Sequence, residues 1–411
     1  MPQLERHKRT KEKRRRSNPA TASTAGFGIN NRITDRTMLY QILDLLERLY
    51  HPPGFGIVRY ITFRAAAAAV SALIIAFWLG PRIIRILREN QIGEAAKLEA
   101  PKTHMAKAGT PTMGGFIVLT ALVIPTVLWA NLTNMYIVLI LFVTIALGGV
   151  GFLDDYLKVV KKKPKGLIGR YKIVGQVFVG FVIGAVIYFF PQWIDSDLWK
   201  LNSFTTVPFF KNQEFDFGVM YIPMVIFFIT ATSNAVNLTD GLDGLAIGIV
   251  GIVALTLAVM SYISGNAILS DYLTIPFLRG NGELAVYCAA LVGAALGFLW
   301  FNAYPAQVFM GDTGSLALGG AIGALCVLIK KELLLPTLCG VFLAETLSVI
   351  IQRLYFKYTR RKYGQGRRVF RMAPLHHHFE MLGWPEPKIV VRFYIVAILM
   401  MIVSLATFKV R

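Results

Sequence analysis

Long apolar stretches, separated by short polar connections, dominate this sequence from residue 60 onward. A stretch of about 20 apolar residues is long enough to cross the hydrocarbon core of a bilayer as a helix. The pattern predicts ten such helices, over residues 60–80, 113–130, 135–154, 173–190, 219–236, 242–264, 284–301, 315–329, 333–351 and 389–408. The expected fold class is therefore an all-α polytopic integral membrane protein, built as a ten-helix transmembrane domain over residues 38–411.

Composition and charge agree with this interpretation. Of the 411 residues, 55% are hydrophobic and only 16% are charged, which is far more apolar than a soluble domain requires. The net charge of +20 could indicate nucleic acid, but its distribution indicates topology: 22 Lys and Arg follow odd-numbered segments and 5 follow even-numbered ones. Because basic connections stay in the cytoplasm, the odd connections should be cytoplasmic and both termini outside. The expected surroundings are membrane lipid, and no nucleic-acid partner is expected.

The first 37 residues differ from the rest of the chain. They contain ten Lys or Arg, three acids and no apolar run, so they are predicted to form a disordered basic extension. A tail of net charge +7 should stay in the cytoplasm, which conflicts with the topology that the connections predict. Two interpretations stay open: translation starts at Met38, before an expected interfacial helix over residues 38–50, or the tail is a basic arm that touches anionic lipid or RNA.

Acidic residues cluster at the ends of three apolar segments, all on the predicted cytoplasmic face. Ionisable groups at membrane depth are costly and are therefore functional candidates. The three motifs are GFLDDYLK with Asp154 and Asp155, NAVNLTDGLDGLA with Asn234, Asn237, Asp240 and Asp243, and FNAYPAQVFMGDTGS with Asn302, Phe309 and Asp312. The spacing of three in the second motif would stack its polar side chains on one side of a helical or turn-like course. One Asp pair alone is more often a helix cap, but three clusters on one face favour a magnesium site that receives pyrophosphate.

Two further motifs offer groups for an anionic donor. The run of His376, His377 and His378 follows several arginines in a cytoplasmic connection, where imidazole and guanidinium groups could bind phosphate. Lys107 and Thr112, in KAGTPTMGG, could supply a cation and a phosphate-approach turn. Glu345 lies inside the ninth segment, and either a pairing role with a neighbouring helix or a catalytic role is open for it.

These motifs, in this order, resemble the polyprenyl-phosphate N-acetylhexosamine 1-phosphate transferases (glycosyltransferase family 4), over residues 38–411. The triple histidine, in APLHHHFE, is similar to the branch that uses UDP-N-acetylmuramoyl-pentapeptide rather than UDP-N-acetylglucosamine. The resemblance implies a reaction of this donor with undecaprenyl phosphate that gives lipid I and UMP, requires magnesium and takes place at the bacterial inner membrane. The 37-residue extension and the basic lead-in KYGQGRRVF depart from the family pattern, and neither touches the catalytic motifs.

The resemblance also implies roles for individual residues. Asp312 is similar to the magnesium-binding aspartate, and Asp154 and Asp155 to the pair that activates the lipid phosphate or assists the metal. His376 is expected to be catalytic. Substrate contacts are expected from Lys107, Thr112, Asn234, Asn237, Asp240, Asp243, Asn302, Phe309, His377 and His378.

Alternative functions are a secondary transporter, a lipid-binding scaffold and the UDP-N-acetylglucosamine branch. A transporter should place its acids near the bilayer midplane, and a scaffold would not need three Asp clusters. Direct attack by the lipid phosphate is the favoured mechanism, and a covalent route through Asp155 is its rival. A homodimer is a further expectation about partners.

Overall fold

The computed structural model describes residue 49 and residues 55–90, 109–163, 166–195, 202–207 and 214–409. The basic extension over residues 1–37, the interfacial helix expected over residues 38–50 (Leu49 apart) and Lys107 lie outside the described residues.

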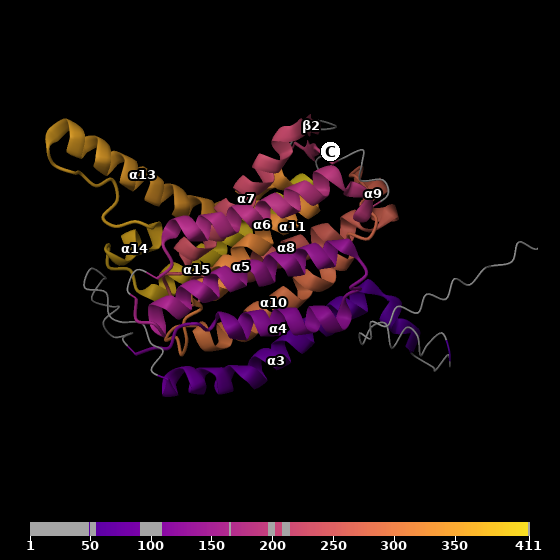
Figure 1. Ribbon diagram of the computed structural model, residues 1–411, viewed down its shortest axis with the longest axis horizontal. Coiled ribbons are helices and arrows are strands. Elements are labelled where there is room, and N and C mark those ends of the chain that lie inside the picture. Colours follow the sequence, from indigo (N-terminus) through magenta and orange to yellow (C-terminus); the bar gives the residue numbers. More distant parts are fainter. Residues whose placement is uncertain are drawn as a thin grey trace, which may run out of the picture. The chain divides into compact units, whose positions relative to one another are not determined.

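Helices make up most of the described chain (Figure 1). The longer ones are α3 (Ile61–Glu89), α4 (Gly115–Trp129), α5 (Met135–Val159), α6 (Gly169–Phe189), α7 (Tyr221–Thr239), α8 (Leu245–Ser264), α10 (Glu283–Asn302), α11 (Gly311–Leu328), α13 (Gly340–Tyr363) and α15 (Glu386–Lys409). The shorter ones are α9 (Ala267–Leu273), α12 (Leu335–Leu338), α14 (Leu375–Glu380) and the 3₁₀ turns η1 (Phe55–Arg59), η3 (Pro191–Trp193), η5 (Gly218–Met220) and η6 (Glu332–Leu334). The all-α interpretation is confirmed, with the addition of one small hairpin, in which β1 (Phe204–Thr206) pairs antiparallel with β2 (Glu214–Asp216).

Each of the ten predicted segments coincides with a helix. Within the described residues, eight helices are long and apolar enough to cross a membrane. The segment predicted over residues 333–351 is the pair Glu332–Leu338 and Gly340–Tyr363, which is bent by 81° and would be a ninth span. The segment predicted over residues 113–130 is α4, which is apolar but has only 15 residues. The protein is therefore a polytopic membrane protein, and the count of ten crossings stays a prediction.

Helix α11 lies at the centre of the packing. Of its 18 residues, 89% are buried, and the helix packs against α4, α5, α7 and α8. Its sequence GDTGSLALGGAIGAL is rich in Gly, Ala and Ser, and such small residues let neighbouring helix backbones approach closely. A central helix with close neighbours fixes the side chains at its first turn relative to those of α5 and α7.

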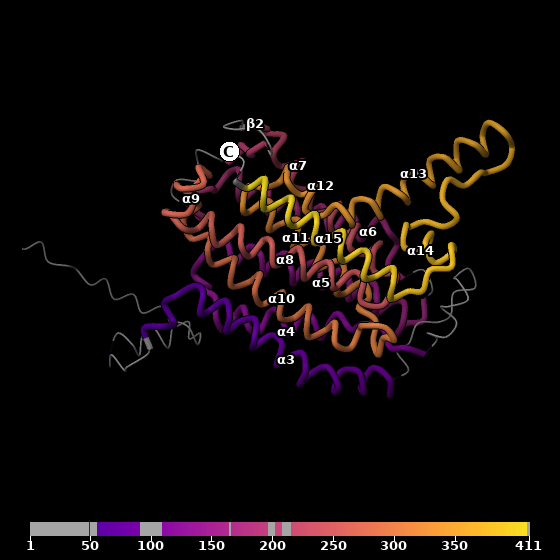
Figure 2. Tube along the Cα trace, turned by 180° about the vertical axis from the view of Figure 1, so that it is seen from behind, coloured from indigo at the N-terminus to yellow at the C-terminus, as the bar shows by residue number. Residues whose placement is uncertain are grey.

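The long helix α13 leaves this packed group. Figures 1 and 2 both show it running outward beyond the other helices, with α14 between its far part and α15. Many of its large apolar side chains are exposed, among them Leu347, Leu354 and Phe356. The bend before Gly340 therefore turns the second half of the ninth segment away from the bundle.

The two ends of the bundle differ in their polar contacts. At one end, which we call the hairpin end, Arg64 forms a buried bidentate ion pair with Glu283 at 2.6 and 2.7 Å. Glu332 also lies there and accepts hydrogen bonds from Tyr221 and Thr205. These contacts join α3 to α10 and the hairpin to η6. The opposite end, where α5, α7 and α10 end and α4 and α11 begin, is called the carboxylate end.

Candidate functional site

Three carboxylates meet at the carboxylate end. Asp154 and Asp155 lie near the end of α5, and Asp312 is the second residue of α11. One oxygen of each lies within 4.8 Å of the others, and the first two residues are buried. Sequence positions 157 apart are brought together because α5 and α11 pack along each other. The predicted convergence of Asp154, Asp155 and Asp312 is confirmed.

Two lysines balance this negative charge. The ammonium group of Lys172 donates to Asp154 Oδ2 at 2.7 Å and to Asp312 Oδ2 at 2.5 Å. Lys158 contacts the same two oxygens at 2.5 and 2.9 Å. Two ammonium groups between two carboxylates offset the cost of burying this negative charge, and they leave cationic groups beside any anion that binds here.

Asp155 has a different set of partners. Its carboxylate accepts from the backbone N–H groups of Asp312 and Thr313, at 3.2 and 2.8 Å, and from Thr313 Oγ1 at 2.6 Å. These N–H groups belong to the first turn of α11, where backbone N–H groups find no acceptor within their own helix. Asp155 therefore caps α11 from the neighbouring helix, and this cap sets the position of Asp312.

The TPTMGG motif lines the same turn. Backbone hydrogen bonds of 2.8 Å join Phe309 N to Pro111 O, Gly114 N to Phe309 O and Gly115 N to Met310 O. Gly311 follows at φ +75°, and a Cβ there would lie 2.8 Å from Asp155 Oδ2 and 3.2 Å from Thr112 Oγ1. The left-handed backbone and the lack of space both require glycine at this position. Thr112 and Phe309, each half-buried, thus lie beside the turn that precedes α11, and their substrate contacts stay predictions.

The side-chain amide of a residue on α7 supports Asp312. Asn237 Nδ2 donates to Asp312 Oδ1 at 2.7 Å and to Ser315 Oγ at 2.8 Å. Asn234, one turn earlier, donates instead to Gln176 Oε1 on α6 and to Thr230 O. The structure therefore brings Asn237 to the carboxylates, whereas the Asn234 amide joins α7 to α6.

The remaining polar residues of the second and third motifs brace the loops. Helix α7 ends at Thr239, so Asn237 lies in its last turn, whereas Asp240 and Asp243 lie in the turn that follows the helix. Asp243 is buried, and its carboxylate accepts from Ala306 N at 3.0 Å. Asn302 is also buried, donates to Val308 O and accepts from Gly244 N. Both side chains hold the 240–244 turn to the 303–308 loop, and Asp240 remains half-buried at the turn.

The three histidines face different ways. His376 is completely buried, and its ring lies between Glu345 on α13 and Gly241. His377 pairs with Glu380 at 2.6 Å, and His378 Nδ1 accepts from Arg371 N at 3.1 Å. Glu345, whose role the sequence left open, thus has a pairing partner on α14.

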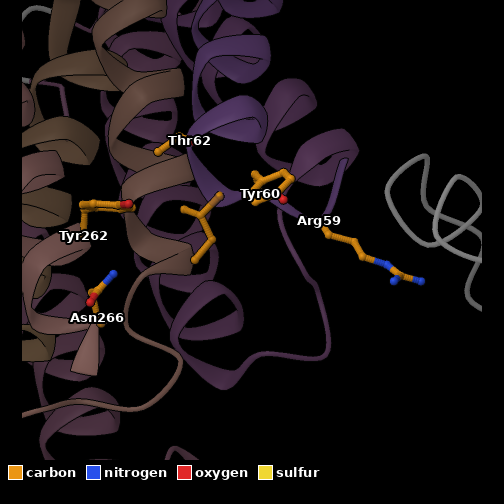
Figure 3. A pocket seen from close by; sticks show the side chains of 7 residues that line it. Arg59, Tyr60, Thr62, Tyr262 and Asn266 are labelled. Carbon is orange, nitrogen blue, oxygen red and sulfur yellow. The ribbon is translucent and has the colours of Figure 1, made fainter. Parts of the chain in front are cut away.

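A small hollow of about 200 Å³ lies far from the carboxylates, at the hairpin end. Figure 3 shows its lining by Tyr60 and Thr62, from the start of α3, and by Tyr262 and Asn266, at the end of α8. None of these residues belongs to a motif that the sequence singled out.

The chemistry of the carboxylate cluster fits a divalent metal ion. Its ligand atoms are all carboxylate oxygens, the donors that hard cations such as magnesium prefer. A zinc site would require Cys or His, and the buried Cys288, Cys326 and Cys339 do not belong to the carboxylate cluster. The buried aspartate cluster could therefore bind a metal.

Sequence reasoning missed Lys158 and Lys172 as site residues. Lys158 carried a local signal, because on a helix it lies four residues after Asp154 and hence on the same face. Lys172 carried none, because the connection over residues 160–168 separates it from the motif and only the packing of α6 returns it to Asp154.

Fold and site together define a class: a polytopic membrane protein whose acidic site lies at the ends of its helices, beside basic groups, and not at mid-span. Residues 137–330 match the sequence model of glycosyl transferase family 4. The chain is 53% identical to the phospho-N-acetylmuramoyl-pentapeptide-transferases of Chloroherpeton thalassium and Chlorobium luteolum and 51% identical to that of Chlorobaculum parvum. Each alignment of 374 residues covers 91% of this chain and 100% of the relative. The chain therefore belongs to the phospho-N-acetylmuramoyl-pentapeptide-transferase family.

Proposed function

We propose that the protein transfers phospho-N-acetylmuramoyl-pentapeptide from UDP-N-acetylmuramoyl-pentapeptide to undecaprenyl phosphate, forming lipid I and UMP. The observation that carries this proposal is the cluster of Asp154, Asp155 and Asp312, interleaved with two lysine ammonium groups at the ends of membrane helices. A site at this depth suits a reaction between a water-soluble donor and a lipid phosphate. The name of the relatives supports this donor over UDP-N-acetylglucosamine.

In this reaction an oxygen of the lipid phosphate forms a bond to the sugar-linked phosphorus of the donor. The bond from that phosphorus to the oxygen retained by UMP breaks. The attacking phosphate is already ionised near neutral pH, so positioning and charge neutralisation suffice. The three donors on the Asp155 carboxylate, which is 4% exposed, support direct attack over a covalent route through this residue.

The site residues divide into three proposed roles. Asp312, with Asp154, would hold magnesium, which when bound supplies positive charge to the pyrophosphate of the donor. Lys158 and Lys172, whose side chains are 37% and 19% exposed, would donate to phosphate oxygens. Contacts to the rest of the donor are proposed for Thr112, Asn237, Asp240, Phe309, His377 and His378.

We place this site on the cytoplasmic face of a bacterial inner membrane. The basic connections flank it, and the exposed run of Lys161, Lys162 and Lys163 follows α5 directly. Self-association into a homodimer stays a prediction, which the mass of the detergent-solubilised protein would test.

One assay tests the function. Purified protein receives UDP-N-acetylmuramoyl-pentapeptide, undecaprenyl phosphate and magnesium, and UMP release is measured, with UDP-N-acetylglucosamine as the control donor. We expect UMP only with the muramoyl donor, and none after chelation of the metal. Turnover of the control donor alone would overturn the assignment.

A further inference from the structure

Glu345 and His376 form a buried pair between two helices of the C-terminal part. Both side chains are completely buried. Glu345 Oε1 accepts from His376 N at 3.2 Å, and Glu345 Oε2 lies 3.3 Å from His376 Nδ1. Among the described residues, neither Glu345 Oε2 nor His376 Nδ1 has any hydrogen-bond partner. His376 Nε2 has none there either, and the 3.3 Å separation places Glu345 Oε2 and His376 Nδ1 within hydrogen-bond distance of each other.

This arrangement fixes where the proton of the imidazole lies. A buried carboxylate oxygen needs a donor, and Nδ1–H is the nearest group that supplies one. With the proton on Nδ1, the other ring nitrogen, Nε2, is an acceptor. A carboxylate that accepts from one imidazole nitrogen sets the tautomer and the ring orientation for the other, as in metal sites and catalytic triads.

The other side of the imidazole ring packs against Gly241, in the turn that follows α7. A Cβ on Gly241 would lie 2.3 Å from His376 Nε2, so only glycine leaves room for the ring. Gly241 belongs to the 240–244 turn, and Asn237, one helical turn earlier, donates to Asp312. Glu345 therefore contacts His376, and His376 contacts the segment that supports the carboxylate cluster.

We propose that Glu345 is a positioning residue for the transfer: it holds His376 with Nε2 toward Gly241 and so fixes the 240–244 turn beside the site. This inference rests on the proposed function, because the turn is proposed to contact the donor. His377 and Glu380 form a similar pair on α14, with side chains that are 15% and 5% exposed. The His377 ring contacts the His376 ring, with 4.2 Å between their centroids, but neither His377 nor Glu380 is the partner of Glu345.

The test is a double-mutant cycle on kcat/KM for the donor. Glu345→Gln keeps the size of the side chain but no longer fixes the tautomer, and we expect a loss of about 10- to 100-fold. Because Glu345 acts through His376, the double variant E345Q/H376Q should be no more than about threefold slower than H376Q alone. Losses that multiply would overturn the proposal.

Two further variants separate positioning from folding. Gly241→Ala displaces the ring from its other side with Glu345 intact, and we expect at least a tenfold loss of kcat/KM. Glu332→Gln, a completely buried carboxylate at the hairpin end, is the matched control and should leave kcat/KM of the folded fraction within about threefold of the wild-type value. A loss in E332Q equal to that in E345Q would overturn the proposal.

Hydrogen exchange gives a readout that needs no turnover. In E345Q, we expect amides of residues 237–246 to exchange at least tenfold faster than in the wild type, and in E332Q to be unchanged. Unchanged exchange in E345Q overturns the positioning role. Wild-type protein that releases no UMP from the muramoyl donor overturns the proposed function instead, and exchange then decides the positioning role alone.

Discussion

At the scale of residues, the site depends on charge balance in a place that water reaches poorly. Lys172 and Lys158 share Oδ2 atoms of Asp154 and Asp312, while Asn237 holds the second oxygen of Asp312. Removal of one charged partner from such a group leaves the others uncompensated. Single substitutions here should therefore act strongly on turnover.

Asp312→Asn tests the metal assignment. The amide keeps the shape of the side chain but supplies one neutral oxygen in place of a carboxylate, so we expect loss of magnesium-dependent UMP release. The amount of membrane-inserted protein, followed by size-exclusion chromatography in detergent, should stay at the wild-type level. Retained activity at ordinary magnesium concentrations would contradict this role.

Lys172→Met tests the lysine that the sequence did not reveal. The variant keeps an unbranched stem and removes the ammonium group from between Asp154 and Asp312, and we expect kcat to fall about 10²- to 10³-fold. Lys163→Met is the control, because Lys163 lies exposed in the basic connection that leads to α6, the helix that carries Lys172. Equal effects of the two substitutions would show that only the overall charge of this connection matters.

At the scale of elements, the position of α5 against α11 decides whether the three aspartates meet. Gly151 lies one turn before Asp154 and Asp155, and a Cβ there would lie 2.1 Å from Asp312 O. Close helix contact through glycine is thus part of the site.

Gly151→Ala should separate the two helices. Overpacking of this kind typically costs about 1–3 kcal/mol, so we expect a lower Tm and reduced UMP release. Gly149→Ala, on the same helix with nothing within 4 Å of the added Cβ, should leave activity unchanged and stabilise the helix by up to about 1 kcal/mol. Thermal unfolding in detergent, beside the UMP assay, would distinguish the pair.

The hairpin end contains a lysine that makes stability depend on pH. Burial lowers the pKa of Lys330 from 10.5 to about 8, although Glu332 opposes this shift. The folded chain therefore binds fewer protons than the unfolded chain between pH 8 and 10.5, and stability should rise with pH across this window. Lys330→Met should remove this rise in urea or thermal unfolding, and a slope equal to that of the wild type would contradict the assignment.

At the scale of the whole molecule, the open question is which end of the bundle faces the cytoplasm. The basic connections predict the carboxylate end. Single cysteines make this testable, because the three native cysteines are buried. In intact cells, a membrane-impermeant maleimide should label Tyr272→Cys on α9 but should label Lys163→Cys only after permeabilisation. The reverse pattern would invert the topology.

The sequence by itself determined the membrane fold and pointed to the three aspartates of the cluster. Crossing a bilayer requires about 20 consecutive apolar residues, which is a local property of the chain, so each predicted segment coincides with a helix. Acids at the ends of such segments are costly to place at membrane depth and are therefore functional candidates. This principle pointed to Asp154, Asp155 and Asp312. The motif order then identified the family.

Only the tertiary structure decided which polar side chains meet. Asp243 and Asn302 accept hydrogen bonds from Ala306 N and Gly244 N, which belong to other connections, and their substrate contacts stay predictions. Lys172 joins the site from α6, and Glu345 on α13 meets His376 on α14 across the connection over residues 364–374. Such contacts arise from the packing of helices distant in sequence, and no local pattern encodes them.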